Sequence, residues 1–257
     1  MDTARIIRAR RQEAATSIRE LAAMANVSPS YLSRIEAGQS IPTTDMATKL
    51  LEMVGYTIGV QPAPQIAPIA ATRKACDPTW DGTWDAAAEA WLNRYQRAGW
   101  VDGVGSVKPN KRPDLLIRTG LTSCVYNRPT GMCFTPAEPT ATWLDVVERL
   151  AQADIDYALT GGPAANQIIN MGGGLDAIVY VPDIDEAAEA AGLCQDPVGW
   201  AVLLPFNGVC EVGRFIQQQG CFADGVQLAA IDQVIIDCAG IPKRGLDQAQ
   251  YLTGKRI

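Results

Sequence analysis

Residues 17–38 read SIRELAAMANVSPSYLSRIEAG, and this stretch decides the fold of the N-terminal part of the chain. Ser17, with Glu20 three residues later, forms a capping-box pattern, which begins a helix by satisfying free backbone N–H groups. Asn26 tolerates the left-handed backbone of a tight helix exit. Ser28 then caps a second helix, and the proline after it takes the first helical position, where no N–H is needed. The stretch therefore predicts two short helices joined by a tight turn.

Apolar residues in and around this stretch give each predicted helix one inward face. Leu21, Ala22 and Met24 or Ala25 are the apolar and small residues of the first helix, and Leu32 and Ile35 lie on one face of the second. A further helix, capped by Thr43 or Thr44, has these inward residues: Met46, Ala47, Leu50 and Leu51. Residues 3–55 therefore predict four or five short helices. In such a unit the second helix of the pair can protrude into the major groove of DNA, which is ~12 Å wide.

The same residues resemble the XRE (Cro/C1-type) family of helix-turn-helix regulators over about residues 3–58. The matching motifs are Glu20-Leu21-Ala22, Val27-Ser28, and Tyr31-Leu32-Ser33-Arg34-Ile35-Glu36 with Gly38. The resemblance implies a dimer that binds double-stranded DNA at a palindromic operator, because two half-sites multiply the discrimination of one helix. The candidate DNA-contacting residues are Ser17, Arg19, Ser28, Pro29, Ser30, Tyr31, Ser33 and Arg34.

Each of these assignments has a structural alternative. Ser17 and Ser28 are helix caps first, and DNA contact would be a second role. Arg34 is either a DNA contact or a solvated charge paired with Glu36 or Glu20. Glu36 itself is expected to be structural and to meet an arginine of the first helix. A basic cluster in that helix either contacts phosphate or is a solvated face: Arg5, Arg8, Arg10 and Arg11.

Composition limits the possible functions. The 257 residues are 47% hydrophobic and 19% charged, a balance typical of a folded protein rather than a disordered one. The net charge is −6, but residues 1–60 hold seven Lys and Arg against six Asp and Glu, so the remainder carries −7. A DNA-binding face must therefore be local. The chain has no histidine, which excludes zinc hydrolases and triads that depend on histidine.

Cysteine usage and hydropathy indicate a cytoplasmic protein. None of the seven cysteines forms a C-x-x-C pair, and the odd number suggests reduced thiols. The start of the chain lacks the apolar region of a signal peptide, and no run approaches the ~18 apolar residues of a membrane span. We expect a cytoplasmic location, no membrane association, no bound metal and no cofactor.

The rest of the chain reads as a linker followed by a mixed α and β domain. Residues 61–78 are rich in Pro and Ala without a clear period and predict a linker, and residues 79–257 predict the second domain. The expected helices are Trp84 to Gln96, Thr142 (as cap) to Ala153, Ala164 to Asn170, Ile184 to Ala191, Ala230 to Cys238, and Leu246 to Leu252. The expected strands are Asp114 to Ile117, Thr122 to Tyr126, Asp156 to Thr160, Asp176 to Val181, and Trp200 to Leu204.

Residues 157–182 suggest the class of the second domain. A strand that runs into Gly161-Gly162, then a helix and another strand, is the opening of nucleotidyltransferase-like domains. Active members carry two carboxylates, one residue apart on the second strand, that hold Mg²⁺. Here Asp176 stands alone, and Asp183 and Asp185 follow the strand. The fold class we predict is an all-α helix-turn-helix domain plus an α+β domain that is nucleotidyltransferase-like and inactive.

Residues 142–257 also resemble the AbiEi family, the antitoxins of type IV toxin–antitoxin systems. The matching pieces are Tyr157 to Ala165, Ile178 to Val181, Val202 to Pro205, Gly225 to Leu228 leading into Val234 to Asp237, and Lys243 to Gly245 with the helix after them. Residues 79–141 fall outside this resemblance. The resemblance implies a non-enzymatic, autoregulating repressor whose partner is a cognate nucleotidyltransferase-like toxin.

Two other functions stay open at this point. A nucleotidyltransferase with a DNA-targeting domain would need Asp176 and either Asp183 or Asp185 to converge on Mg²⁺ near Gly161-Gly162. A ligand-sensing repressor would need an effector pocket in the second domain. A basic stretch is either a wing that reaches the DNA backbone or a solvated hairpin: Lys108, Lys111, Arg112, Arg118 and Arg128.

Overall fold

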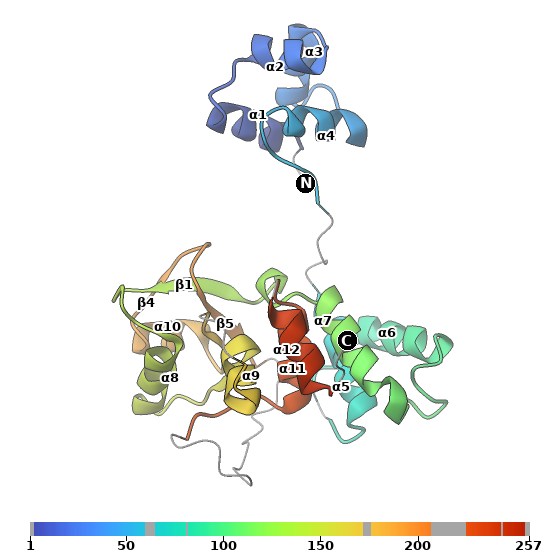
Figure 1. Ribbon diagram of the computed structural model, residues 1–257, viewed down its shortest axis with the longest axis vertical. Helices are drawn as coiled ribbons and strands as arrows, with labels where there is room; N and C mark the ends of the chain where they lie inside the picture. The colour runs from blue at the N-terminus through green and yellow to red at the C-terminus, as the bar shows by residue number, and fades with distance from the viewer. Residues whose placement is uncertain are drawn as a thin grey trace. The chain divides into compact units, whose positions relative to one another are not determined.

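The chain divides into two compact units, Met1–Gln61 (unit 1) and Pro62–Ile257 (unit 2). A computed structural model describes residues 3–59, 65–80, 82–171, 176–206, 225–242 and 244–254 (Figure 1). Each unit has its own hydrophobic core within these residues. Lys243, which belongs to the motif expected before the last helix, lies outside the described residues.

Unit 1 contains the helices that the sequence predicts. They are α1 (Thr3–Glu13), α2 (Ile18–Ala25), α3 (Pro29–Glu36) and α4 (Thr44–Glu52). The predicted apolar faces meet in one core, in which Leu21, Leu32, Ile35 and Leu50 are fully buried and Ile7 of α1 is 1% exposed. The inward pattern read from the sequence is therefore confirmed.

The helix boundaries in unit 1 follow from the capping chemistry. Ser17 and Glu20 form both bonds of a capping box, and Ser28 accepts a backbone N–H of α3. Asn26 ends α2 in the left-handed conformation, with φ 57° and ψ 48°. Thr43 caps α4, which resolves the choice between Thr43 and Thr44. Local side-chain-to-backbone bonds thus fix where each helix starts and stops.

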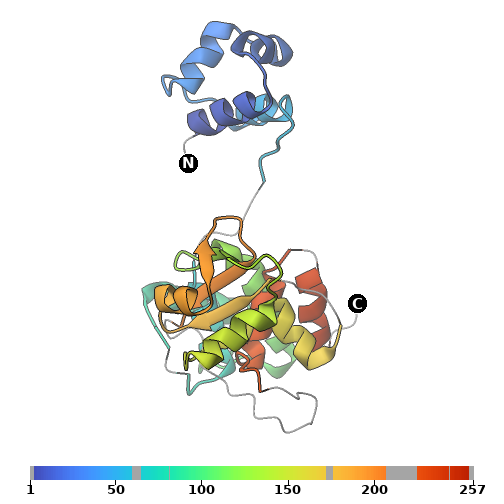
Figure 2. The ribbon, with the colours of Figure 1, turned by 90° about the vertical axis from the view of Figure 1, so that its left-hand side faces the viewer.

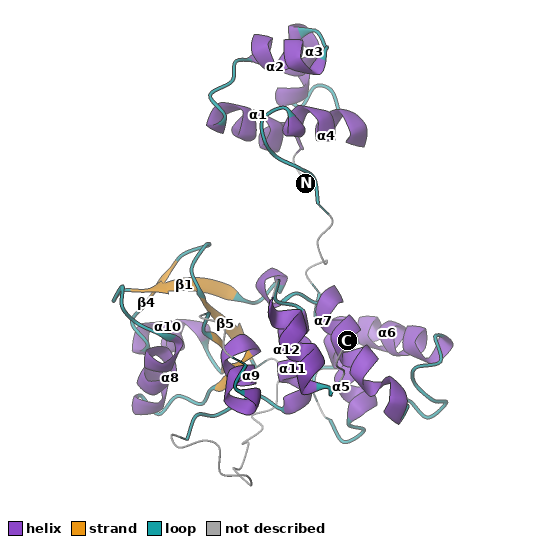
Figure 3. Cartoon of the chain, in the orientation of Figure 1, coloured by secondary structure: helices purple, strands orange, loops and turns teal. Residues whose placement is uncertain are grey.

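Unit 2 is built on a mixed sheet of five strands (Figure 3). The strands are β1 (Met132–Pro136), β2 (Ala158–Thr160), β3 (Ile178–Val181), β4 (Leu193–Gln195) and β5 (Ala201–Pro205). Their order is β2-β3-β5-β1-β4, with β3 and β5 parallel and the other neighbours antiparallel. Val179 of β3 pairs with Leu159 and with Leu203. All four residues of β3 are buried, so this strand lies at the centre of the core.

Helices surround the sheet. They are α5 (Ala67–Cys76), α6 (Ala86–Arg97), α7 (Arg112–Thr122), α8 (Trp143–Gln152), α9 (Gly161–Ile169), α10 (Ile184–Ala190), α11 (Ile231–Ala239) and α12 (Arg244–Leu252), with 3₁₀ turns η1 (Pro109–Lys111) and η2 (Val125–Asn127). Helices α8 and α10 pack together beside the sheet (Figure 2). Helix α11 lies among several elements and contacts β2, α5, α7, α9 and α12.

Three expectations for unit 2 are corrected. The segment 61–78, expected to be a linker, contains the buried helix α5, in which Ile69 and Ala71 are fully buried. The strands expected at 114–117 and 122–126 are instead the helix α7 and the turn η2, because Leu115, Leu116 and Thr119 bury one helical face. Gly161 and Gly162, expected to precede a helix that starts at Ala164, form the first turn of α9 instead.

The remaining expected elements of unit 2 are confirmed to within a few residues. They are α6, α8 with Thr142 as its cap, β2, α9, β3, α10, β5, α11 and α12. Strands β1 and β4 were not predicted. The mixed sheet with surrounding helices agrees with the α+β class expected of this part of the chain.

Candidate DNA-binding surface

Helix α3 has one buried face and one exposed polar face. Leu32 and Ile35 are fully buried against the core of unit 1. Ser30, Ser33 and Arg34 are exposed. The spacing of three residues between the inward side chains Leu32 and Ile35 places them on one side of the helix and leaves these polar residues on the others. The result is a short helix that is anchored by its apolar side and presents hydroxyl and guanidinium groups to solvent.

The other predicted contact residues cluster at the starts of α2 and α3. Ser28 Oγ accepts the Tyr31 backbone N–H at 3.2 Å and lies 3.2 Å from Ser30 Oγ. Tyr31 is half-buried and packs against the core. Pro29 and Arg19 are exposed on the first turns of their helices. First-turn N–H groups have no intrahelical acceptor, and together with the helix dipole they make such a site attractive to phosphate.

The capping box at Ser17 is complete. The Ser17 N–H donates to Glu20 Oε2 at 2.8 Å, and the Glu20 N–H donates to Ser17 Oγ at 3.2 Å. The hydrogen bond from the Ser17 backbone holds the pKa of Glu20 below its ordinary value. Ser17 is therefore a cap, as expected, and its hydroxyl still lies at an exposed helix start.

Arg34 pairs with neither of the acidic residues considered for it. Glu36 is engaged by Arg11, and Glu20 by the Ser17 cap. Within the described part of the chain, no ion pair includes Arg34 or Arg19. Both guanidinium groups are thus available to an external anion or base edge.

The buried partner of Glu36 is the arginine of α1 that the sequence analysis left unspecified. Arg11 Nε donates to Glu36 Oε1 at 2.7 Å, and Arg11 Nη2 donates to Oε2 at 2.8 Å. Arg11 Nη1 also donates to the Thr16 carbonyl at 2.8 Å. The side chains are only 11% and 6% exposed. This bidentate pair joins α1 to the end of α3, so it fixes the direction of α3 and removes Arg11 from the basic cluster.

The remaining arginines of α1 divide into two kinds. Arg10 pairs with Glu13 and lies over the ring of Tyr56, and its hydrogen bond lowers the pKa of Glu13. Arg8 is exposed and, with Gln12 and Ser33, lines a hollow of about 220 Å³ between α1 and α3. The sequence analysis missed Gln12; its spacing of four residues from Arg8 places both on one face of α1.

The basic stretch expected to be a wing or a hairpin is neither. Arg112 donates to Asp232 Oδ2 at 2.5 Å and to the Cys76 carbonyl at 3.1 Å. Arg128 is buried and pairs with Asp237 and the Tyr180 hydroxyl. The segment is helical, and two of its arginines hold unit 2 together rather than extending from it.

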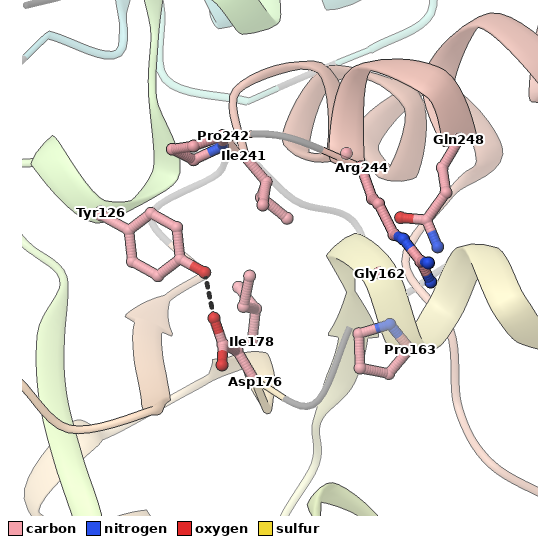
Figure 4. A pocket seen from close by; sticks show the side chains of 10 residues that line it. Tyr126, Gly162, Pro163, Asp176, Ile178, Ile241, Pro242, Arg244 and Gln248 are labelled. Carbon is pink, nitrogen blue, oxygen red and sulfur yellow. Dashed lines mark hydrogen bonds between the residues drawn. The ribbon is translucent and has the colours of Figure 1, made fainter. Parts of the chain in front are cut away.

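The carboxylates that the enzyme alternative requires lie apart. Asp176 lines a pocket with Gly162, as that alternative expects (Figure 4). Asp183, however, caps α10 through the Glu186 N–H, at the other end of β3. Seven residues of nearly extended chain span roughly 20 Å at about 3.3 Å per residue. Asp185 follows in the first turn of α10, so this set does not converge on one ion.

Comparison with known proteins agrees with the geometry of unit 1. Residues 7–60 match a family model described as Helix-turn-helix. No curated protein and no solved structure matches the chain significantly. Among the described residues, no helix combines the length and the apolar character of a membrane span. Unit 1 is a helix-turn-helix domain of the XRE type, which suggests a DNA-binding transcription regulator.

Proposed function

Because unit 1 is a helix-turn-helix domain, we propose that the protein is a sequence-specific transcription regulator that inserts α3 into the major groove. The observation that carries the proposal is the exposed polar face of α3 opposite two fully buried anchors, Leu32 and Ile35. A rigid helix start with free N–H groups supplies phosphate binding, and protruding side chains supply contacts with base edges.

The proposed roles follow from where each side chain lies. Ser17, Arg19 and Ser28 stand at the starts of α2 and α3 and bind phosphates on either side of the groove. Ser30 and Ser33 contact bases with their hydroxyl groups. Arg34 carries an unpaired guanidinium, the group best suited to the two acceptors of guanine in the major groove. Two protomers bind the two halves of a palindromic operator.

Unit 2 is proposed to bind a protein partner rather than DNA. The chain after residue 60 carries a net charge of −7, which repels the DNA backbone and favours a partner with a basic surface. Together with the resemblance of residues 142–257 to AbiEi proteins, this charge supports an autoregulating antitoxin with a nucleotidyltransferase-like toxin as its partner. Unit 2 also provides surfaces for the homodimer.

We propose further that unit 2 is not a magnesium-dependent nucleotidyltransferase. The support is the placement of Asp176 before β3 and of Asp183 after it. Mg²⁺ needs its oxygen ligands at about 2.0–2.1 Å. In the described residues, no group of three or more Cys, Asp and Glu side chains is arranged to hold a metal.

Operator binding by point variants tests the DNA-binding role. The affinities of Arg34→Ala and Ser30→Ala for DNA from the protein's own promoter region are measured by fluorescence anisotropy at fixed ionic strength. Arg34→Ala should weaken binding by about 5- to 150-fold, since a bidentate base contact contributes about 1–3 kcal/mol. Arg97→Ala, an exposed arginine of α6 in unit 2, removes the same charge and should leave the affinity unchanged.

Two outcomes bear on this proposal directly. If Arg34→Ala and Ser30→Ala, both folded by circular dichroism, bind like the unaltered chain, α3 is not the recognition helix.

For the antitoxin role, the neighbouring reading frame is expressed alone and together with this chain. Growth arrest that this chain relieves is expected; a neighbour that is harmless alone contradicts the antitoxin role and leaves DNA binding untouched.

A further inference from the structure

Unit 2 contains a pocket of about 210 Å³ between α9, α12, η2 and the start of β3. These segments are far apart in the sequence and meet only in the fold (Figure 4). Within the described residues, the pocket is partly open to solvent and lined by apolar side chains, with polar groups at its two ends. The apolar side chains are those of Pro163, Ile178, Ile241 and Pro242.

One end of the pocket is acidic. Tyr126 Oη donates to Asp176 Oδ2 at 2.5 Å. Burial, together with the hydrogen bond to Asp176, raises the pKa of Tyr126 above its ordinary value, so the phenol stays protonated and keeps donating. No hydrogen bond among the described residues uses the second carboxylate oxygen of Asp176. That oxygen is an unused acceptor with a negative charge.

The opposite end supplies donors. Arg244 and Gln248, one turn apart on α12, both extend toward Gly162 and Pro163 (Figure 4). The guanidinium of Arg244 has no partner in the described part of the chain. Gln248 is only 3% exposed, and its amide Nε2 is buried without a hydrogen-bond acceptor. A buried, unpaired amide costs free energy and is typical of a position that an absent acceptor completes.

The start of α9 strengthens this donor end. Gly161 and Gly162 form its first turn, and the helix is nine residues long. Its first N–H groups lack intrahelical acceptors, and its dipole favours an anion there. Two independent observations, the helix start and the unpaired amide of Gln248, therefore point to an anionic group at the same end of the pocket.

We propose that this pocket binds a small zwitterion, with a carboxylate held by Arg244, Gln248 and the start of α9, and an ammonium group held by Asp176. The charges of Arg244 and Asp176 balance, so a ligand of zero net charge is favoured over a phosphate dianion. The volume lies between the ~150 Å³ that accommodates benzene and the ~300 Å³ at the lower end of drug-sized pockets. A short aliphatic amino acid with a terminal amine fits these limits.

The test uses the full chain and three small probes. The zwitterion γ-aminobutyrate is compared with butyrate, which keeps only the anionic end, and with butylamine, which keeps only the cationic end. Isothermal titration should show that γ-aminobutyrate binds about tenfold or more tightly than either single-ended probe. β-Alanine and 5-aminopentanoate then report the spacing that the pocket requires.

Two variants assign each end. Arg244→Gln should weaken the binding of γ-aminobutyrate and of butyrate by about tenfold or more and leave the binding of butylamine unchanged. Asp176→Asn, which can still accept from Tyr126, should weaken γ-aminobutyrate and butylamine and leave butyrate unchanged. Arg97→Gln on α6 is the matched control and should alter none of the three.

Several results overturn the proposal. If none of the zwitterions binds, the pocket is not a zwitterion site. The same conclusion follows if they bind but neither Arg244→Gln nor Asp176→Asn changes their affinity. Tighter binding of Mg²⁺-ATP that depends on Asp176 assigns the pocket to a nucleotide instead. None of these measurements includes DNA, so they succeed or fail independently of operator binding.

Discussion

The buried pair between Arg11 and Glu36 should govern the stability of unit 1. Glu36→Gln keeps the size of the side chain but removes its charge, and the amide NH2, which is a donor, replaces one of the two oxygens that accept from Arg11. Breaking one partner of a buried ion pair costs about 3–5 kcal/mol. Because Gln retains one hydrogen bond, we expect a loss near the lower limit, about 3 kcal/mol.

That loss is large relative to the unit. A unit of 61 residues is expected to have a free energy of unfolding of about 3–9 kcal/mol. A small domain loses about 4–8 °C of melting temperature per kcal/mol, so the transition of unit 1 should fall by about 12–24 °C. Differential scanning calorimetry of the full chain measures this shift, and operator affinity falls with the folded population.

Two further variants make the reasoning refutable. Glu13→Gln breaks the Arg10–Glu13 pair, whose side chains are 42% and 47% exposed, and should leave the melting temperature nearly unchanged. The double variant Arg11→Met with Glu36→Leu leaves no unpaired buried charge. Its free energy of unfolding should therefore lie within about 1 kcal/mol of that of the unaltered chain. If Glu36→Gln melts no lower than Glu13→Gln, the pair does not anchor α3.

Three other predictions concern single positions. Ser28→Ala removes the cap of α3 and should destabilise unit 1 by about 1 kcal/mol in urea unfolding, with Ser28→Gly closer to the unaltered chain; equal midpoints for all three would contradict the capping role. Gly120→Ala places a Cβ 2.1 Å from the Ile236 carbonyl oxygen, where α7 meets α11, and should cost unit 2 about 1–3 kcal/mol. Gly103→Ala, with open space around its Cβ, is the control, and equal losses would show that the contact does not matter. Burial raises the pKa of Cys76 from 9.0 to about 12. The stabilisation that the neutral, buried thiol gives to the folded state is therefore fully present below pH 9 and is lost as the pH rises toward 12. The stability of the unaltered chain should therefore fall relative to Cys76→Ala between those values, and parallel curves in urea titrations would refute the assignment.

Unit 1 is predictable from its sequence because its signals are local. Ser17 with Glu20, Asn26 and Ser28 each bond to backbone within a few residues, so they mark helix ends without any knowledge of the fold. The polar face of α3 follows from the helical spacing of its two buried residues, Leu32 and Ile35. The arginine that pairs with Glu36 was expected only as a member of the first helix, since it lies 25 residues away in the sequence.

Helix α5 escaped prediction because neighbouring elements cover it on nearly all sides. It packs against α6, α7 and α11, and even Thr72 and Arg73 are buried. A helix with no solvent face shows no 3.6-residue alternation of polar and apolar positions. Its Pro and Ala content then resembles that of a linker. The prediction of a strand in the α7 segment was wrong for a related reason, because Leu115 and Leu116 form a short apolar run that fits a strand as well as a helix.

Strands β1 and β4 depend on partners remote in sequence. Phe134 pairs with Gln195 and Ala201, more than sixty residues away. The strands have only five and three residues. Cys194 and Gln195 of β4 are both exposed, and β1 alternates only over Phe134 to Pro136, so neither strand gives a sustained signal in the sequence. The pocket of unit 2 was expected only as a possibility for the same reason, because its lining comes from four separate segments.

The separate cores of the two units make the DNA reader an exchangeable module. The core of unit 1 draws on residues 6–54, and the main core of unit 2 on residues 66–252. Among the described residues, no side chain belongs to both. Recombination near residue 61 can therefore replace one type of operator-reading head by another without repacking the remainder. A lineage that keeps unit 2 unchanged can in this way acquire a new target promoter in a single genetic step.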